Sequence, residues 1–207
     1  MIGKPTAFIT FEGADGTGKS TQFALTTKYL KSKGLRVLEV REPGGSLISE
    51  RIRELLLHGP DMDMLTELLL YMAARAENYK KVISQAVGDY DFIIGDRSID
   101  SSVAYQGYAR GLPIDVIKYL NHLVTDGYKP SVTYLMDLDP AIARRRLGDA
   151  IDRIEQEGIL FQEKVRDGFL AEAAKDPERF VIIDGGQSPE SCSQEIKQDI
   201  YRRFSEY

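Results

Sequence analysis

The stretch Gly13-Ala14-Asp15-Gly16-Thr17-Gly18-Lys19-Ser20 decides the fold, and it directly follows the apolar run 7–11. It has the pattern G-x-x-x-x-G-K-[ST], which is typical of loops that bind nucleotide phosphates. A buried strand that ends in such a turn and opens a helix aims several backbone N–H groups at one point, where the helix dipole also favours an anion. Lys19 then reaches the β- and γ-phosphates, and the Ser20 hydroxyl binds Mg²⁺. The alternative is an ordinary glycine-rich turn.

The size and composition of the chain favour one cytoplasmic domain spanning 1–207. With 27 Lys and Arg against 32 Asp and Glu, the net charge is −5, so the chain as a whole is not a nucleic-acid-binding surface. Cys192 is the only cysteine, which excludes an intramolecular disulfide and a cysteine-based zinc cluster. No apolar run approaches the ~20 residues of a membrane span, and the N-terminus resembles a strand more than a cleavable signal.

Strand and helix patterns alternate along the chain. Five short, apolar and β-branched runs are predicted strands: Ala7–Phe11, Val37–Val40, Phe92–Gly95, Thr133–Asp137 and Phe180–Asp184. Seven runs have helical patterns: Thr21–Lys33, Ser49–Leu57, Met64–Val87, Ile114–Thr125, Ala141–Arg146, Leu160–Ala174 and Pro189–Phe204. This alternation predicts an α/β fold with a five-stranded parallel sheet and helices on both faces.

Polar or glycine-rich residues follow four of the five predicted strands, and ligands of open parallel sheets bind at those carboxyl ends. Asp96 ends one strand, and we expect it to hold Mg²⁺ directly or through water. Arg97 comes next and is suited to phosphate because its donors form a fixed fork. The alternative for Arg97 is a surface salt bridge with Asp96 or Asp100.

Two further segments suit a ligand. In the stretch 41–46, Gly44 and Gly45 allow the backbone close to a ligand, and Pro43 holds the loop extended. Its alternative is a plain connecting turn. Tyr71 and Arg75 share one helix face at i and i+4, and together they suit a flat base with carbonyl edges. Taken alone, these two residues favour a core tyrosine beside a solvated arginine.

Four arginines flank a glycine-containing stretch at about 144–157, which we expect to be a short lid: Arg144, Arg145, Arg146 and Arg153. They are too many to engage one phosphate group together, so we expect at least two of them to be solvated. One or two can move over the phosphates as an arginine finger supplied by the same chain.

Taken together, these motifs resemble the thymidylate kinase family over nearly the whole chain. The phosphate loop, the segments 41–46 and 70–75, the run from Asp96 through 101–107, the stretch 130–140 and Asp152-Arg153-Ile154-Glu155 match the family in order. The resemblance implies a P-loop NTPase fold that phosphorylates dTMP to dTDP with ATP and Mg²⁺ for dTTP synthesis. It also implies a homodimer that binds these small molecules and neither nucleic acid nor a membrane.

The resemblance implies a role for each matched residue. Gly13 to Ser20 and Thr21 would hold ATP, with Ser20 and Asp96 at the metal. Asp15 would touch the sugar 3′-hydroxyl, Arg97 with Arg41 the acceptor phosphate, and Tyr71 the thymine face. Arg75, Gln106 and Ser102 would read the polar edge of the base, and Tyr105 would crowd a 2′-hydroxyl. Pro43 and Ser101 complete the implied substrate contacts, and Lys19, Arg97, Arg153 and Asp15 the catalytic set.

The family differs within itself over the source of one arginine. Some members carry it in the phosphate loop, where this chain has Gly16, and others supply it from the lid, which Arg153 fits. Four residues depart from the family pattern: Ser49, Asn78, Ser98 and Ser131. Asn78 and Ser98 are nearest the implied acceptor pocket, where they bear on the strictness for the nucleobase.

The expected reaction is in-line attack of a dTMP phosphate oxygen on the γ-phosphorus of ATP, catalysed by positioning and charge neutralisation. One rival is a nucleoside kinase, in which Glu12 would be the base for a hydroxyl. A second rival is a nucleotide switch, which predicts GTP specificity. Against it, the sequence lacks an Asn-Lys-x-Asp motif.

Overall fold

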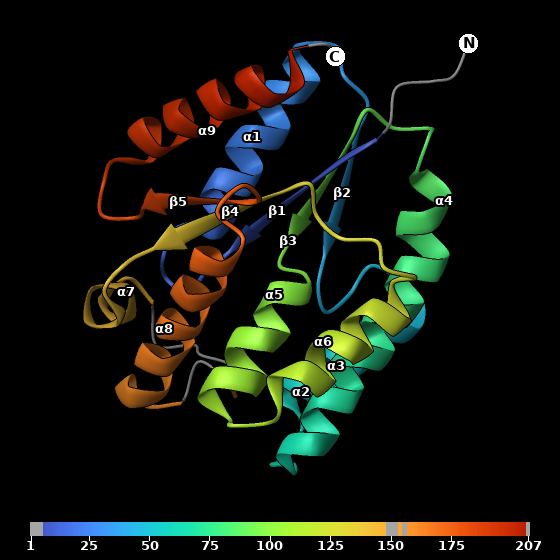
Figure 1. Ribbon diagram of the computed structural model, residues 1–207, viewed down its shortest axis with the longest axis vertical. Coiled ribbons are helices and arrows are strands. Elements are labelled where there is room, and N and C mark those ends of the chain that lie inside the picture. Colours follow the sequence, from blue (N-terminus) through green and yellow to red (C-terminus); the bar gives the residue numbers. More distant parts are fainter. Residues whose placement is uncertain (1–5, 148–152, 155–156, 206–207) are drawn as a thin grey trace.

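The computed structural model describes residues 6–147, 153–154 and 157–205. Five parallel strands form one sheet in the order β2-β3-β1-β4-β5 (Figure 1). The strands are β1 (Ala7–Glu12), β2 (Val37–Arg41), β3 (Phe92–Asp96), β4 (Val132–Asp137) and β5 (Phe180–Asp184). The α/β fold class and all five predicted strands are confirmed, with boundaries that differ by at most one residue.

The central strand β1 is buried on both faces of the parallel sheet. All six of its residues are buried, and it pairs with β3 on one side and β4 on the other. A strand covered on both faces reads as a continuous apolar run, as the sequence 7–11 does. The position of β1 also places the phosphate loop, which follows it, at the centre of the carboxyl edge.

Helices follow the strands in the chain. They are α1 (Lys19–Ser32), α2 (Leu47–His58), α3 (Met64–Asn78), α4 (Ser84–Ala86), α5 (Ile99–Ser102), α6 (Ile114–Val124), α7 (Pro140–Arg146), α8 (Ile159–Lys175) and α9 (Pro189–Phe204). Two π-helical turns join them, η1 (Tyr79–Ile83) between α3 and α4 and η2 (Val103–Ala109) after α5. The predicted helix Met64–Val87 is therefore three consecutive pieces, and the α5–η2 segment was not predicted.

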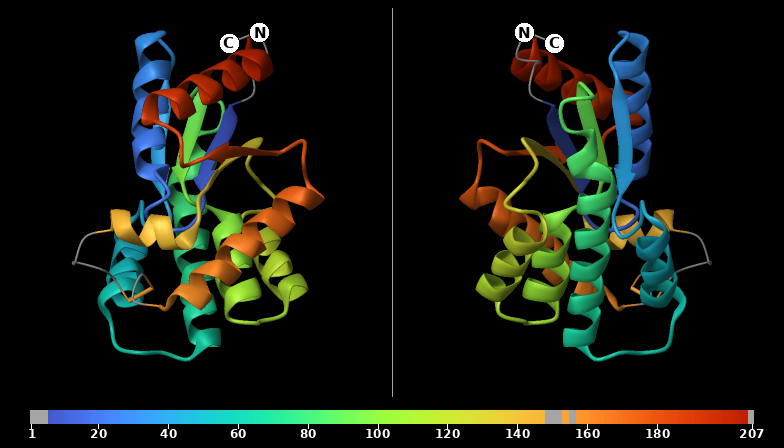
Figure 2. Two further views of the ribbon diagram at one scale, coloured as in Figure 1. Left: turned by 90° about the vertical axis from the view of Figure 1, so that its left-hand side faces the viewer. Right: turned by 90° about the vertical axis from the view of Figure 1, so that its right-hand side faces the viewer.

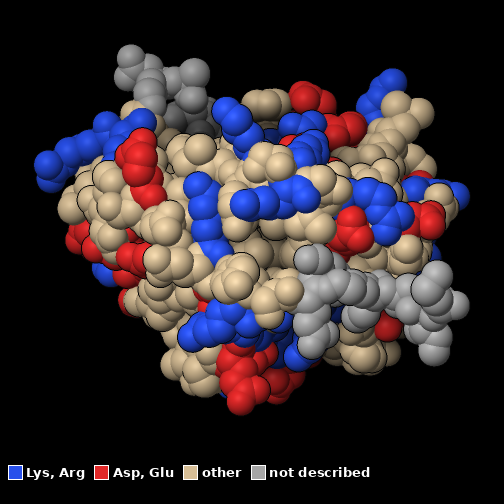
Figure 3. Space-filling model, turned by 90° about the horizontal axis from the view of Figure 1, so that it is seen from above, with Lys and Arg blue, Asp and Glu red and all other residues tan. Residues whose placement is uncertain are grey.

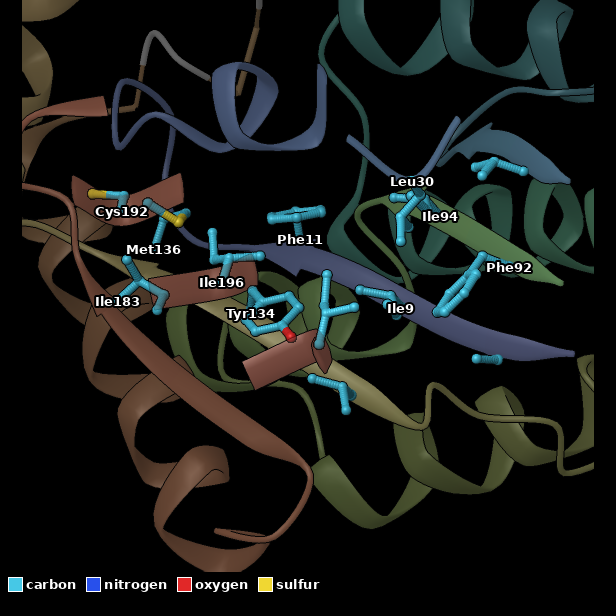
Figure 4. Close-up of a cluster of buried hydrophobic side chains, with 14 residues drawn as sticks. Ile9, Phe11, Leu30, Phe92, Ile94, Tyr134, Met136, Ile183, Cys192 and Ile196 are labelled. Atoms are coloured by element: carbon cyan, nitrogen blue, oxygen red, sulfur yellow. The ribbon is translucent and has the colours of Figure 1, made fainter. Parts of the chain in front are cut away.

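One face of the sheet packs against α1 and α9. Figure 4 shows side chains of the strands, such as Phe11 and Tyr134, gathered with Leu30 of α1 and Ile196 of α9. The Phe11 and Tyr134 rings stack with their centroids 5.5 Å apart. Side chains alternate along a strand, so the intervening residues of β1 and β3 face the other side.

The opposite face is covered by two groups of helices. Phe8 and Ile93 pack under η1 and α4, and Leu135 and Phe180 pack with residues of α8 and η2. Figure 2 shows both termini at the end of the molecule remote from α2 and α3. The helices α2, α3, α6, α8 and η2 thus lie on the side toward which the strands point.

Short polar side chains fix where several helices begin. Ser46 Oγ accepts from Ser49 N at 3.2 Å at the start of α2, and Asp139 Oδ1 accepts from Ala141 N at 2.8 Å at the start of α7. Each bond satisfies a backbone donor that the first helical turn leaves unpaired. These caps fix the residues at which α2 and α7 begin.

Part of the predicted lid, residues 148–152 and 155–156, lies outside the described residues. On the face seen in Figure 3, Lys and Arg are interspersed with Asp, Glu and neutral side chains. In the described part of the chain, no helix has the length and apolar character needed to cross a membrane.

Candidate active site

The strands end at a cleft of about 680 Å³. Most of the predicted site residues line it: Asp15, Gly16, Thr17, Gly18, Lys19, Ser20, Thr21, Arg41, Pro43, Tyr71, Arg75, Asp96, Arg97, Ser101, Ser102, Tyr105 and Gln106. Gly13 and Ala14 stand behind this lining, where their carbonyl oxygens accept hydrogen bonds from Arg97 and Lys19. The predicted catalytic residue that the structure does not bring to the cleft is Arg153.

At two positions of the phosphate loop, neighbouring backbone leaves no space for a Cβ atom, so both positions require glycine. A Cβ on Gly13 would lie 2.5 Å from Met136 O, and one on Gly16 would lie 2.3 Å from Ala143 O. Both glycines also have positive φ angles, 134° and 79°. Because α7 packs directly against Gly16, the loop has no room for an arginine at this position.

A single carboxylate oxygen binds the two cations of the loop region. Asp15 Oδ1 accepts from Lys19 Nζ at 3.2 Å and also pairs with Arg97 Nη2. Lys19 Nζ donates in addition to Ala14 O at 2.7 Å. Burial alone would raise the pKa of Asp15, but Arg97 and Lys19 outweigh it and hold that pKa well below its usual range. Two positive groups and one negative group therefore meet at the start of α1.

Arg97 reaches this point through an unusual backbone conformation. Its φ angle is 67°, a left-handed value that is uncommon outside glycine. Its Nη1 donates to Gly13 O at 3.0 Å, and its guanidinium lies 5.3 Å from the centre of the Tyr105 ring. The alternative of a surface salt bridge with Asp96 or Asp100 is wrong, because Arg97 is mostly buried and pairs with Asp15.

Glu12, the last residue of β1, stabilises the turn that follows Arg97 by accepting hydrogen bonds. Its carboxylate is fully buried and accepts from Ser98 N at 2.7 Å, Ser101 N at 3.3 Å and Ser101 Oγ at 2.6 Å. Burial, with repulsion from Asp100, raises the pKa of Glu12 to about 8. Glu12 does not line the cleft, so the rival assignment of Glu12 as a base for a nucleoside hydroxyl has no support in this geometry.

The two predicted metal ligands lie next to each other at the cleft. Ser20 Oγ is 3.5 Å from Asp96 Oδ2. A hydroxyl and a carboxylate are the hard oxygen donors that Mg²⁺ prefers, and this ion commonly takes only one or two protein ligands beside substrate phosphates. The residues present therefore fit a magnesium ion bound with a nucleotide.

Arg75 is buried rather than solvated, which corrects the alternative reading of the Tyr71–Arg75 pair. The side chain is 2% exposed and pairs with Glu42 Oε2 at 2.6 Å. Its Nη1 donates to Ser102 Oγ at 2.9 Å and Asn121 Oδ1 at 2.6 Å. These bonds hold the planar fork in one orientation beside the cleft.

The unpredicted π-helical turn η2 supplies two of the site residues. Tyr105 OH donates to Asp15 Oδ2 at 3.4 Å, and Gln106 Nε2 donates to Glu67 Oε1 at 2.9 Å. Turns of this kind are often found at functional sites because they change which side chains face a neighbour. Here η2 presents Tyr105 and Gln106 to the same cleft as Tyr71 of α3.

A second group of arginines lies around the segment 41–46 and the helix α2 that follows it. Arg41 Nη2 pairs with Glu50 Oε2 at 2.7 Å, and Arg53 Nη1 donates to Pro43 O at 2.9 Å. Arg53 lines the cleft but was not predicted as a site residue. Its position three residues after Glu50 on a helix is the sequence signal that could have identified it.

The described arginines of the predicted lid have different surroundings. Arg146 lines the cleft and donates to Gly185 O at 2.9 Å. Arg144 and Arg145 are exposed on α7. Arg153 lies elsewhere, since it pairs with Glu67 Oε2 at 2.7 Å and donates to Leu56 O at 2.9 Å. In this structure Arg146, not Arg153, is beside the phosphate loop.

At the end of the cleft beyond the phosphate loop, the sequence indicated a ligand-binding strand end but not the individual residues that line it. The unpredicted residues there come from α1, from the loop that joins β5 to α9 and from the start of α9 itself: Gln22, Gly185, Gln187, Pro189 and Cys192. The glycines that follow β5 were the available signal. The cleft therefore extends from these residues past the phosphate loop to Tyr71 and Gln106.

Comparisons with known proteins agree with this geometry. Residues 11–196 match the profile of the family described as thymidylate kinase. The chain is 49% identical to the thymidylate kinase of Synechococcus sp. (strain JA-3-3Ab) over 88% of this chain and 89% of the relative. It is 42% identical to that of Geotalea uraniireducens (strain Rf4) over 96% and 98%. The crystal structure of thymidylate kinase from Ehrlichia chaffeensis has a TM-score of 0.79 at 35% identity, covering 95% of this chain and 99% of that one.

The raised pKa of Glu12 predicts a dependence of stability on pH. The ordinary pKa of a glutamate is 4.5, so between pH 4.5 and about 8 the folded chain holds a proton that the unfolded chain releases. The contribution of Glu12 to the free energy of unfolding is therefore full below pH 4.5 and is lost as the pH rises to about 8. Chemical denaturation should show a fall of up to about 1.4 kcal/mol per pH unit from this group.

Glu12→Gln should remove this part of the slope, and Glu163→Gln, a change at an exposed glutamate, should leave it intact. Equal slopes for the wild type and Glu12→Gln between pH 5.5 and 8 would contradict a protonated Glu12.

Proposed function

The chain belongs to the thymidylate kinase family, and we propose that its cleft holds ATP at the phosphate loop and dTMP between Arg97 and Tyr71. The chain phosphorylates dTMP to dTDP and uses ATP as the phosphate donor. The proposal concerns the residues that carry out this reaction.

The observation that carries the proposal is the shared oxygen of Asp15. Lys19 at the start of α1 and Arg97 at the end of β3 both contact Asp15 Oδ1. Lys19 belongs to the donor side and Arg97 to the acceptor side, so the two cations lie where a γ-phosphate and an acceptor phosphate would meet. A substrate that brings its own phosphate to Arg97 fits this arrangement better than a neutral nucleoside does.

On the acceptor side, we assign the base to Tyr71, Arg75, Ser102 and Gln106. The buried fork of Arg75 is held by Glu42, so it cannot move freely away from a bound base. Tyr105 contacts Asp15 and lines the same cleft as the base-binding residues, which suits contact with the sugar. Arg41 and Arg53 add positive charge near the acceptor phosphate. Two further residues complete the acceptor side of the cleft. They are Pro43 and Ser101, whose hydroxyl lies beside Arg97.

The reaction needs positioning more than proton transfer. An oxygen of the dTMP phosphate attacks the γ-phosphorus of ATP, the bond to the bridging oxygen breaks, and ADP leaves. The attacking oxygen is already anionic, so no general base is required. Lys19, Arg97 and the backbone N–H groups of the loop stabilise the charge that gathers during transfer. We assign Mg²⁺ to Ser20 and Asp96, where it would neutralise charge on the donor phosphates when bound.

We further propose that the enzyme is a homodimer acting in the cytoplasm. Helix α3 packs between α2 and α6. These three helices carry exposed apolar side chains: Leu47, Ile48, Leu55, Leu65, Leu69, Val116, Tyr119 and Leu123. Apolar side chains grouped on neighbouring helices are typical of protein interfaces. Fractionation of cells tests the location.

A dimer formed through these helices predicts that Leu65→Glu with Leu69→Glu yields a monomer, because two charges would be buried without partners. Sedimentation equilibrium measures the mass of each variant. Leu160→Glu changes an exposed leucine on α8, outside this group of helices, and should leave the dimer intact. A wild-type chain that sediments as a monomer at micromolar concentration would refute this part of the proposal.

The acceptor assignment predicts that dTMP has the highest kcat/KM among dTMP, dUMP, dCMP, AMP and thymidine. Thymidine lacks the phosphate that Arg97 and Arg41 would bind, and AMP carries a larger base with a different polar edge. Release of ADP from ATP, measured by a coupled assay, gives each value. A higher value for thymidine or AMP would overturn the assignment, and GTP hydrolysis without an acceptor would favour a nucleotide switch.

The placement of the lid arginines predicts unequal effects of their removal. Arg146→Ala should lower kcat about 10²-fold or more, because Arg146 is beside the phosphate loop and Gly16 leaves that loop without an arginine. Arg145→Ala, a change at an exposed residue of the same helix, is the control and should have a small effect. Should Arg153→Ala prove costlier in kcat than Arg146→Ala, Arg153 is the catalytic arginine that the sequence predicts, and it reaches the phosphates only when substrates bind.

A further inference from the structure

A buried carboxylate on α3 has no role in the mechanism above. Glu67 is 1% exposed, and its two oxygens accept four hydrogen bonds from three residues. Oε1 accepts from Gln106 Nε2 at 2.9 Å and Arg110 Nε at 3.3 Å. Oε2 accepts from Arg110 Nη2 at 3.1 Å and Arg153 Nη2 at 2.7 Å. Glu67 thereby connects α3, the turn η2 and residue 153.

The surroundings of Glu67 keep it ionised. Burial alone would raise its pKa, but the hydrogen bonds from Gln106, Arg153 and Arg110 outweigh burial and lower that pKa. An ionised carboxylate can only accept hydrogen bonds. The atom that Gln106 turns toward Glu67 must therefore be its NH₂ group, which removes the usual ambiguity between the two ends of an amide.

The orientation of Gln106 decides which polar atom the cleft receives. Gln106 lines the cleft, and its NH₂ group is bound to Glu67. No described residue donates a hydrogen bond to Gln106 Oε1, and this oxygen is not among the fully buried polar atoms without a partner. The carbonyl end of the amide thus remains as a hydrogen-bond acceptor for a ligand.

We propose that Glu67 is a positioning residue that sets the nucleobase preference of the cleft by fixing the Gln106 amide with its carbonyl toward the base. The proposal rests on the proposed function and specifies how its acceptor base is chosen. Thymine and uracil carry a ring N–H that can donate to this carbonyl. Cytosine has an unprotonated ring nitrogen at the same position, so two acceptors would face each other.

Glu67→Gln should turn the Gln106 amide around. Two of the three arginine bonds to position 67, including the shortest, reach Oε2, so the arginines should keep the carbonyl of the new glutamine on that side and lose only the longest bond, from Arg110 Nε. Its NH₂ group then faces Gln106, and the Gln106 carbonyl must turn toward it to accept the hydrogen bond. The NH₂ group of Gln106 would point into the cleft, where it suits the ring nitrogen of cytosine.

The measured quantity is the ratio of kcat/KM for dTMP to that for dCMP. We expect Glu67→Gln to lower this ratio about tenfold or more through opposite changes, a loss for dTMP and a gain for dCMP. The change should appear in KM and in the dissociation constants of the two nucleotides measured by calorimetry. A residue that only stabilises the fold would lower both activities together and leave the ratio unchanged.

Further variants separate the role of Glu67 from general damage. Glu157→Gln makes the same chemical change on a carboxylate that pairs with Arg110 at 2.5 Å but is not in contact with Gln106, so the ratio should stay at the wild-type value. In a Gln106→Leu background, Glu67→Gln should have no further effect on the ratio, because the amide through which it acts is gone. If Glu67→Gln fails to fold, Glu67→Asp keeps the charge but shortens the reach, and it should lower the ratio without a gain for dCMP.

The outcomes distinguish this proposal from the proposed function. A wild-type chain that does not prefer dTMP over thymidine and AMP would refute the proposed function itself. A wild-type chain that prefers dTMP, with an unchanged dTMP to dCMP ratio in the folded Glu67 variants, would refute the positioning role alone. An equal shift of the ratio in Glu157→Gln would also refute it.

Discussion

The site depends on one backbone hydrogen bond, from Arg97 N to Phe11 O at 3.0 Å. It continues the parallel pairing in which Phe11 is opposite Asp96, and it places the end of β3 beside the first residues of the phosphate loop. The chain then turns through the left-handed conformation of Arg97, and Glu12 stabilises this turn by accepting the N–H groups of Ser98 and Ser101. A shift of this register would separate the two cations that share Asp15.

The charges of the cleft explain how an acidic protein binds highly anionic substrates. The chain has a net charge of −5, yet cationic groups from separate elements converge on one cleft: Lys19, Arg41, Arg53, Arg75, Arg97 and Arg146. Several of these cations are paired with carboxylates of the chain itself, Asp15 with Lys19 and Arg97 among them. Bound phosphates would compete with Asp15 for these cations, so binding exchanges one set of ion pairs for another and leaves few buried charges unpaired.

The sequence predicted the parts of the molecule that depend on local pattern. The five strands and the residues directly following them were identified, because apolar runs and glycine-rich turns are local signals. The segment α5–η2 was missed, since Ser101, Ser102 and Gly107 are weak helix formers and a π-helical turn changes the helical period. Arg153 was expected at the phosphates, but its position is determined by Glu67, a partner 86 residues away in the chain.

The most direct test is the turnover of Lys19→Ala, because the charge that Lys19 brings to the phosphates is central to the proposed reaction. We expect kcat for dTMP phosphorylation to fall by at least about 10²-fold, with a melting temperature close to that of the wild type, since Arg97 still pairs with Asp15. Lys28→Ala, at an exposed lysine of the same helix, should keep full activity. Near-normal turnover by a stably folded Lys19→Ala enzyme would contradict the account.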